Sequence, residues 1–207
     1  MIEGASDVNE SLATGEAKPV TKHVGDFVIA GTSNGDGALK IKVTRIGEAT
    51  FLAGVMRLVR EAQAIQSRWP LKLVYFQDDV FGFQPKWLAE FARKWKSEVG
   101  VPFHAQMRLE MTQHAGGDKR LDLFREAGCS GITLAIESGN AFLRDHVLFR
   151  HMPDELILEG CKKITDRGMT LRTEQILGVP FSNLETELQT LDLNARIKPT
   201  MAWTSIL

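Results

Sequence analysis

From Leu71 onward, short apolar runs alternate with amphipathic segments in units of about 30 residues. The apolar runs that we predict to be strands are Leu71–Phe76, Val101–Ala105, Ile132–Ile136, Met169–Leu177 and Ala202–Leu207. The amphipathic segments that we predict to be helices begin near Pro85, Arg120, Asp154 and Ser182, the last with a capping box to Glu185. Serial strand–helix units imply a parallel sheet with right-handed crossovers, so the predicted fold class is α/β.

The beginning of the chain follows a different pattern. Glycines in tight-turn settings flank a short predicted strand at Phe27–Ile29. A further strand is predicted at Leu39–Thr44, where apolar and polar residues alternate. From Gly47 to Gln66 the apolar residues repeat every three to four positions, which predicts an amphipathic helix. We therefore expect two domains, a small β-rich piece ending in a helix over residues 1–66 and an α/β domain over residues 67–207.

Composition and charge exclude few classes of function. The 207 residues are 43% hydrophobic and 25% charged, with a net charge of −1, so neither nucleic acid nor a membrane surface is an expected partner. No apolar run approaches the roughly 18 residues of a membrane span, and the start of the chain lacks a signal-peptide pattern, so we expect a cytoplasmic protein. Cys129 and Cys161 are far apart and are predicted to be buried thiols, with no disulfide and no metal site.

Polar residues follow the predicted strands at the points where the strands end. They are Asp78 and Asp79 after the first strand, Arg108 after the second, Glu137 and Ser138 after the third, and Gly178 after the fourth. Because the carboxyl ends of parallel strands meet at one edge of a sheet, these residues should form one rim, where ligands bind. Carboxylates, a guanidinium and a bare backbone suit a ligand with an ammonium group, a carboxylate and ribose hydroxyls. The alternative is that these acids and glycines only cap helices and form turns.

Residues 71–207 contain several longer motifs in a fixed order. They are Phe76-Gln77-Asp78-Asp79-Val80-Phe81, Leu123–Cys129, Ala135–Asn140, Arg144–Arg150 and Ile176–Pro180. With these motifs the segment resembles the radical S-adenosylmethionine (SAM) enzymes, in particular the cobalamin-associated branch. The resemblance implies a partial parallel (β/α) barrel of about four to five strand–helix units, with SAM as a small-molecule ligand.

The same resemblance implies which residues contact the ligand. These are Asp78 and Asp79 at the amino end of SAM, Glu137 and Ser138 at the ribose, and Gly178 beside the adenine, with Arg108 and Gly139 on the same rim.

One departure from the family affects the expected chemistry. The sequence lacks the CxxxCxxC loop whose thiolates hold a four-iron four-sulfur cluster in this family. Its two cysteines, Cys129 and Cys161, fall on predicted core faces and cannot replace three clustered ligands. The iron–sulfur cluster of the parent family is therefore not supported, and we expect a chain that binds SAM at most and is catalytically incomplete.

Residues 3–63 contain a second set of motifs. In order they are Glu3–Ser6, Thr14-Gly15-Glu16, Pro19-Val20, Gly25-Asp26, Val28–Thr32, Asn34-Gly35, Gly47–Thr50 and Ala62-Gln63. With these motifs the segment resembles the actuator domain of P-type ATPases, and especially that of the heavy-metal (copper-type) exporters. The resemblance begins inside the usual pattern, so we expect a truncated actuator-like piece.

This second resemblance implies a catalytic role for Glu16, with Thr14 and Gly15 shaping its loop. In the family this glutamate positions the water that hydrolyses an aspartyl phosphate, since a carboxylate orients and partly deprotonates an attacking water. The phosphorylated aspartate, the nucleotide domain and the membrane helices of a pump are absent from the sequence. Ala13 and Ala17 also depart from the family pattern, which has a larger apolar residue and a serine or proline there.

Three interpretations of the whole chain remain open. The first is a SAM-binding fragment of a radical SAM-type barrel, and the second is an actuator-like module that acts on a cation-transporting ATPase. The third is a chimera of two gene fragments without a function of its own. The sequence does not indicate an oligomeric state.

Overall fold

A computed structural model describes residues 1–10, 18–29, 32–43, 47–113 and 116–207, without the side chains of residues 47–53. The chain divides into two compact units, Met1–Gly54 and Val55–Leu207. The division falls inside helix α2 (Gly47–Gln66). Within the described residues, no helix combines the length and the apolar character needed to cross a membrane.

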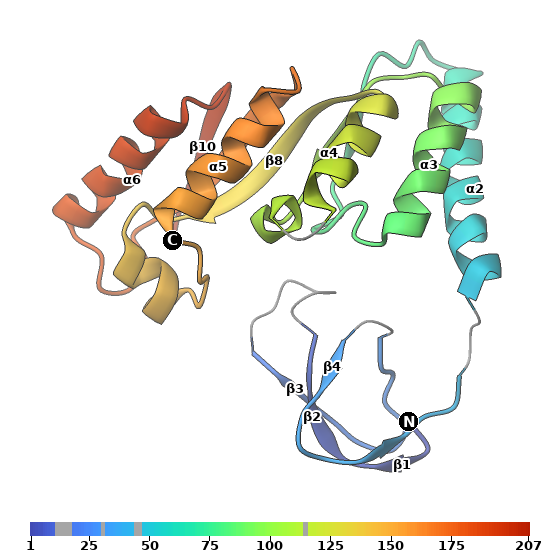
Figure 1. Ribbon diagram of the computed structural model, residues 1–207, viewed down its shortest axis with the longest axis horizontal. Coiled ribbons are helices and arrows are strands. Elements are labelled where there is room, and N and C mark those ends of the chain that lie inside the picture. Colours follow the sequence, from blue (N-terminus) through green and yellow to red (C-terminus); the bar gives the residue numbers. More distant parts are fainter. Residues whose placement is uncertain (11–17, 30–31, 44–46, 114–115) are drawn as a thin grey trace. The chain divides into compact units, whose positions relative to one another are not determined.

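The first unit contains short antiparallel strands (Figure 1). β1 (Glu3–Gly4) pairs with β5 (Leu39–Lys40). β2 (Ser6–Asn9) lies between β3 (Val20–Lys22) and β4 (Ser33–Asn34). This arrangement confirms the predicted β-rich piece before the α/β part.

Two of the strand predictions for this unit are wrong. Phe27–Ile29 pairs with no described strand, and Phe27 is 79% exposed, so it has neither a ladder partner nor a buried face. The strand expected over Leu39–Thr44 ends at Lys40, because Ile41 and Val43 are exposed and unpaired with any described strand, and Thr44 lies outside the described residues. Strand β2 was not predicted, because its only large apolar side chain is the buried Val8.

The second unit contains one parallel sheet of five strands in the order β10-β9-β8-β7-β6. The strands are β6 (Val74–Phe76), β7 (Phe103–Gln106), β8 (Cys129–Glu137), β9 (Thr170–Leu177) and β10 (Met201–Ile206). The helices are α3 (Pro85–Glu98), α4 (Gly117–Glu126), α5 (Asp154–Thr165), α6 (Leu184–Ile197), the short 3-10 helix η1 (Leu109–Thr112) and the π-helix η2 (Leu143–Val147). The sheet curls into a half-barrel, which confirms the predicted partial (β/α) barrel, and helices α2 to α6 follow one another along its outer side (Figure 1).

Aromatic side chains fill the core between the sheet and helix α3. Pro85 occupies the first turn of α3, and the buried Phe91 and Trp95 lie one turn apart on its inner face. Phe103 of β7 is fully buried at the centre of this cluster. Its ring centroid lies 5.4 to 6.4 Å from those of Phe76, Phe81, Phe91, Trp95 and Phe124.

The capping box of α6 is shifted by one residue from its predicted place. Asn183 has extended backbone angles, and its side chain accepts from the Thr186 amide at 3.1 Å. The Thr186 hydroxyl in turn accepts from the Asn183 amide at 2.9 Å. The predicted box between Ser182 and Glu185 is therefore wrong, because the backbone enters the helix only at Leu184.

The end of α2 belongs to the core of the second unit. Val55 and Val59 are fully buried there, together with Ala62. The Gln63 and Gln66 side-chain amides donate to the carbonyls of Glu98 and Val99, both at 3.1 Å. They thereby satisfy two carbonyl groups at the carboxyl end of α3, which lack partners within that helix.

We expect the Val59→Ala variant to lower the free energy of unfolding of the second unit by about 2 kcal/mol, because it removes buried methyl groups and leaves a cavity. The measurement is urea unfolding followed by tryptophan fluorescence, since all four tryptophans lie in this unit. The neighbouring Arg60 is exposed, and Arg60→Ala should stay within about 0.5 kcal/mol of the wild type. Equal effects of the two substitutions would show that α2 does not belong to this core.

Candidate functional site

The rim residues predicted from the sequence do lie at one end of the sheet. Strands β6 to β9 are parallel and adjacent, so the residues that follow each strand share the carboxyl edge. Asp78 and Asp79, after β6, are exposed, and both carboxylates are without an ion pair to any described residue. Arg108, after β7, is instead held by Glu110 at 2.9 Å. Burial would raise the pKa of Glu110, but the hydrogen bonds and charge of Arg108 keep it below its usual value.

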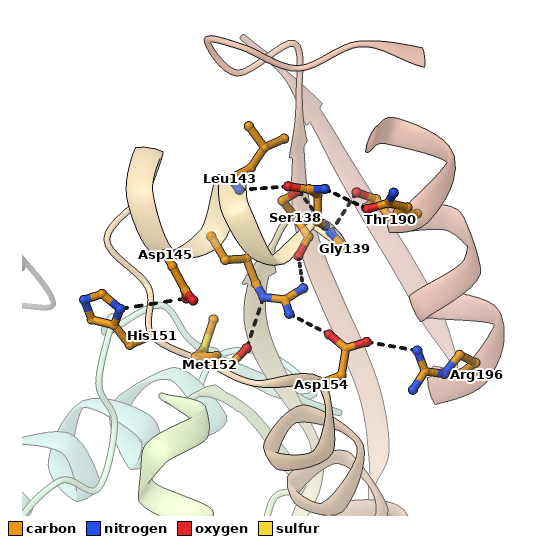
Figure 2. Close-up of polar contacts among 12 residues, drawn as sticks. Ser138, Gly139, Leu143, Asp145, His151, Met152, Asp154, Thr190 and Arg196 are labelled. Carbon is orange, nitrogen blue, oxygen red and sulfur yellow. Dashed lines mark hydrogen bonds and ion pairs between the residues drawn. The ribbon is translucent and has the colours of Figure 1, made fainter. Parts of the chain in front are cut away.

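The turn after β8 is tightly fixed. Glu137 ends the strand in the left-handed region, with φ of 71°. The buried Ser138 hydroxyl accepts from the Asn140 amide at 3.1 Å, and the Gly139 amide donates to the Thr190 hydroxyl of α6 at 2.8 Å (Figure 2). A Cβ at Gly139 would lie 2.3 Å from backbone atoms of α6, so only glycine fits there. Ser138 and Gly139 thus hold the turn that carries Glu137.

A buried arginine supports this turn from below. Arg144 of η2 is 1% exposed, and its guanidinium donates to the Ser138 carbonyl at 2.8 Å and to the Met152 carbonyl at 3.1 Å. It also pairs with the Asp154 carboxylate at 2.6 Å, and the other oxygen of Asp154 accepts from Arg196 at 2.9 Å. Figure 2 shows Ser138, Met152 and Asp154 converging on the guanidinium from the turn, from the segment after η2 and from the start of α5. The turn, α5 and α6 are therefore tied together.

At the end of β9, Gly178 has φ of 79°, a value that favours glycine. Its amide donates to the Glu187 carboxylate of α6 at 2.9 Å. The nearest atom to a Cβ added there would be the Leu207 carbonyl oxygen at 3.6 Å. A Cβ there would thus be in ordinary contact with Leu207, while Gly178 itself is exposed.

Burial raises the pKa of the Glu137 carboxyl above its ordinary 4.5, while the Arg150 charge opposes the shift and the Glu174 charge reinforces it. The folded state therefore favours the protonated form, so its contribution to stability is full below about pH 4.5 and is lost as the pH rises through the folded-state pKa. We expect Glu137→Gln, which cannot ionise, to abolish this loss. The free energy of unfolding of the variant should exceed that of the wild type by more at neutral than at acid pH, as urea titrations at several pH values would measure. A difference that stays constant with pH would contradict the expectation.

A polar network on the inner face of the half-barrel was not predicted from the sequence. The rings of Tyr75 and His104 stack with centroids 4.9 Å apart, and His104 shares a hydrogen bond of 2.7 Å with the Thr133 hydroxyl. Gln106 donates to the Tyr75 hydroxyl at 3.3 Å. Burial, together with the charge of Arg172, lowers the pKa of His104, so its imidazole stays neutral near neutral pH. The available signal was the alternation of polar His104 and Gln106 with apolar neighbours along β7.

On β9, Arg172 pairs with Glu174 at 2.8 Å, and its guanidinium lies 4.8 Å from the Trp203 ring centroid on β10. Together with the β7 network, these residues give the inner face hydrogen-bonding and charged groups.

The rim residues fit part of a SAM molecule. Asp78, Asp79 and Glu137 supply carboxyl groups, and Gly178 supplies an exposed backbone, whereas Arg108 already has a partner. The cysteines do not fit an iron–sulfur cluster. Both are buried, and burial raises the pKa of the Cys129 and Cys161 thiols to about 12, so neither is the thiolate that iron needs. Among the described residues, no group of three or more His, Cys, Asp or Glu side chains is placed to hold a metal ion.

The predicted catalytic loop of the first unit, Thr14, Gly15 and Glu16, lies outside the described residues. Its role therefore stays a prediction, as do the ligand roles of the rim residues and the cytoplasmic location.

Residues 1–60 match the family model of the P-type ATPase actuator domain. Over 68 residues the chain is 50% identical to the copper-exporting P-type ATPase B of Archaeoglobus fulgidus. The aligned segment covers 33% of this chain and 10% of that protein. Over 83 residues it is 53% identical to the probable copper-transporting ATPase PacS of Synechococcus elongatus. This aligned segment covers 40% of this chain and 11% of that protein. The chain thus spans about a tenth of the length of these relatives.

Solved structures of radical SAM enzymes match the fold of a larger part of the chain. The radical SAM methyltransferase TsrM of Kitasatospora setae, solved with cobalamin and an iron–sulfur cluster, superposes with a TM-score of 0.61 at 14% identity, over 73% of this chain and 30% of that one. The cobalamin-dependent SAM radical enzyme OxsB gives a TM-score of 0.60 at 17% identity, over 75% of this chain and 23% of that one. At sequence identities this low, the superposition shows a similar fold and nothing more. The chain therefore joins an actuator-type segment to a half-barrel with the fold of cobalamin-type radical SAM enzymes.

Proposed function

We propose that the second unit binds SAM at the carboxyl-end rim of its sheet. The exposed carboxylates of Asp78 and Asp79 pair with the ammonium group of the ligand. Glu137 binds the ribose hydroxyls, and the exposed backbone at Gly178 receives the adenine. Bound SAM supplies a reactive sulfonium centre, while the residues of the chain bind and orient the molecule.

The observation that carries this proposal is the rigid turn that presents Glu137. It is fixed by the buried Arg144 below and by the Thr190 hydroxyl at its side. A turn that is already ordered loses little conformational entropy on binding, which favours affinity. Because its shape is imposed by contacts with α5 and α6, the turn exists before any ligand arrives.

We also propose that this unit does not generate radicals by itself. The sequence holds two cysteines, and both are buried in separate elements with thiols that resist ionisation. The proposed activity is therefore binding of SAM, and radical chemistry on it requires a second protein that supplies the electron.

The test of the binding site is calorimetric titration of the full chain with SAM, with adenosine and methionine as separate probes. Asp78→Asn combined with Asp79→Asn should weaken SAM binding about tenfold or more, because charge-assisted hydrogen bonds to the ammonium are lost. The same variant should leave adenosine binding unchanged. Glu126→Gln is the matched control, since this exposed acid lies at the carboxyl end of α4, away from the rim. Equal weakening in both variants would show that SAM does not use this rim.

The match of residues 1–60 to the actuator domain favours a second function for the first unit. We propose that Glu16 positions water for hydrolysis of the aspartyl phosphate on a separate phosphorylation domain of a copper-type pump. Adding the full chain to such a phosphorylated domain should accelerate dephosphorylation, and Glu16→Gln should abolish the acceleration. Glu3→Gln, an exposed acid that pairs with Lys40 in the same unit, should not. No acceleration by the folded wild type would remove this function.

A further inference from the structure

A cavity of about 350 Å³ lies between the amino-terminal halves of helices α3 and α4. These helices are neighbours in the row that covers the outer side of the half-barrel (Figure 1). The lining residues belong to the two helices and to Gly116 just before α4, so the cavity is separate from the rim residues. Clefts that bind small molecules have volumes of roughly 300 to 1,000 Å³, so this cavity suits a small ligand.

The lining of the cavity combines positive charge with apolar surface. Three of the lining side chains are cations: Lys86, Lys119 and Arg120. Apolar side chains form much of the remaining wall: Leu88, Ala89 and Leu123. Among the residues that the structure describes, no aspartate or glutamate lines the cavity. A ligand that fits this lining has an anionic group and an apolar part.

Arg120 carries a partly buried charge. Its two terminal nitrogens donate to the carbonyls of Met111, at 3.0 Å, and Phe83, at 3.2 Å. Within the described part of the chain, its buried Nε has no acceptor and no carboxylate pairs with its guanidinium. Burial lowers the pKa of this guanidinium below its ordinary value, because its charge is desolvated. Since desolvated charges in proteins are normally paired, the guanidinium favours an anionic ligand.

The acids close to the cavity do not neutralise its cations. They pair elsewhere: Asp118 and Asp122 with Arg167, at 2.9 and 2.7 Å, and Glu90 with Arg93, at 2.6 Å. The remaining acid of α4, Glu126, lies at the carboxyl end of that helix and does not line the cavity. Lys86 and Lys119 are exposed, and neither forms an ion pair with a described residue. The cavity therefore keeps three positive charges without a counter-charge.

We propose that this cavity binds a small phosphorylated organic molecule. Its phosphate group contacts Lys86, Lys119 and Arg120, and its organic part lies against Leu88 and Leu123. A phosphate monoester carries about −1.5 to −2 charges at pH 7 and three acceptor oxygens, which suit three cations. SAM has no phosphate group, so this ligand is a different molecule. Because two carbonyl groups already hold the guanidinium of Arg120, ordering it costs little entropy on binding.

The test is calorimetric titration of the full chain with phenyl phosphate, with inorganic phosphate and benzoate as comparison probes. We expect one saturable site for phenyl phosphate and weaker binding of the other two. Lys86→Gln combined with Lys119→Gln should weaken the binding of phenyl phosphate about tenfold or more, because charge-assisted hydrogen bonds are lost. Ala89→Glu at an exposed lining position should also weaken it, because the new carboxylate repels the phosphate.

The matched control is Lys72→Gln combined with Lys96→Gln. Both lysines are exposed and lie outside the lining, and the control removes the same total charge from the chain. It should leave the binding of phenyl phosphate within about twofold of the wild type, whereas a diffuse effect of charge would weaken binding in both double variants. Near-UV circular dichroism verifies that each variant folds. Arg120 stays unchanged in all of them, because it also connects two loops.

Two results would overturn the proposal as a whole: no saturable binding of phenyl phosphate by the folded wild type, and equal weakening in the two double variants. Inorganic phosphate or benzoate that binds as tightly as phenyl phosphate would overturn the assignment to a phosphorylated organic ligand. Asp78→Asn combined with Asp79→Asn should leave the binding of phenyl phosphate unchanged. Failure of this cavity and failure of the SAM rim are therefore distinguishable.

Discussion

Replacing Arg144 with methionine is expected to lower the free energy of unfolding of the second unit by about 3 to 5 kcal/mol. Methionine keeps most of the buried volume but cannot donate to Ser138 and Met152 or pair with Asp154. Two carbonyl groups then lose their donor in a region from which water is excluded, and the partly buried carboxylate of Asp154 keeps only Arg196. Urea unfolding monitored by tryptophan fluorescence measures the loss.

The matched control for this substitution is Arg196→Met. Arg196 pairs with the same carboxylate of Asp154, but its side chain is 46% exposed. Water screens such a pair, so the expected loss is below about 1 kcal/mol. If Arg144→Met were as mild as Arg196→Met, the buried network would not be what holds the turn after β8.

The Phe103→Ala variant is expected to cost about 3 to 5 kcal/mol of the free energy of unfolding. Phe103 is fully buried at the centre of the aromatic cluster, so its removal leaves a cavity among the rings of α3, α4 and β6. The surrounding rings come from different elements and cannot collapse together into the space. The same urea titration applies, with the unfolding midpoint as readout.

Phe142→Ala is the control for the loss of a phenyl ring, because Phe142 is 57% exposed and contacts only the His146 ring among the described aromatic residues. It should change the free energy of unfolding by less than about 1 kcal/mol. A small effect of Phe103→Ala would mean that the cluster is loosely packed and does not hold β6, β7 and α3 together.

Most of the second unit could be predicted from the sequence because local patterns and the fold agree there. Trp87, Phe91 and Trp95 recur at helical spacing, and they do share the inner side of α3. The first unit was harder to predict, because its strands are very short and mostly polar. In Ser6–Asn9 a single buried valine gives no recognisable alternation.

Only the part of the site that lies at the ends of the strands could be predicted from the sequence. Parallel strands place Asp78, Glu137 and Gly178 at one edge whatever the details of packing. The inner-face residues were missed because Arg172 and Glu174 alternate along β9 like solvent-facing residues, and periodicity does not tell the inside of a barrel from water.

Arg144 was missed for a different reason. In the sequence it looks like any charged residue within a motif. It is buried because Met152 and Asp154, which come later in the chain, fold back over it. Ser138 and Gly139 were correctly placed in the rim turn, but the contacts that the structure shows for them are with the protein's own backbone and with α6.

Calorimetric titration of the folded wild-type chain and of Glu137→Gln with SAM tests whether the rim binds this ligand. We predict one saturable site per chain for the wild type and binding about tenfold weaker in the variant, since the carboxyl group that receives the ribose is lost. Circular dichroism and the tryptophan unfolding curve establish that both proteins are folded. No saturable binding by the folded wild type, or identical binding by the variant, would show that SAM does not bind at this rim.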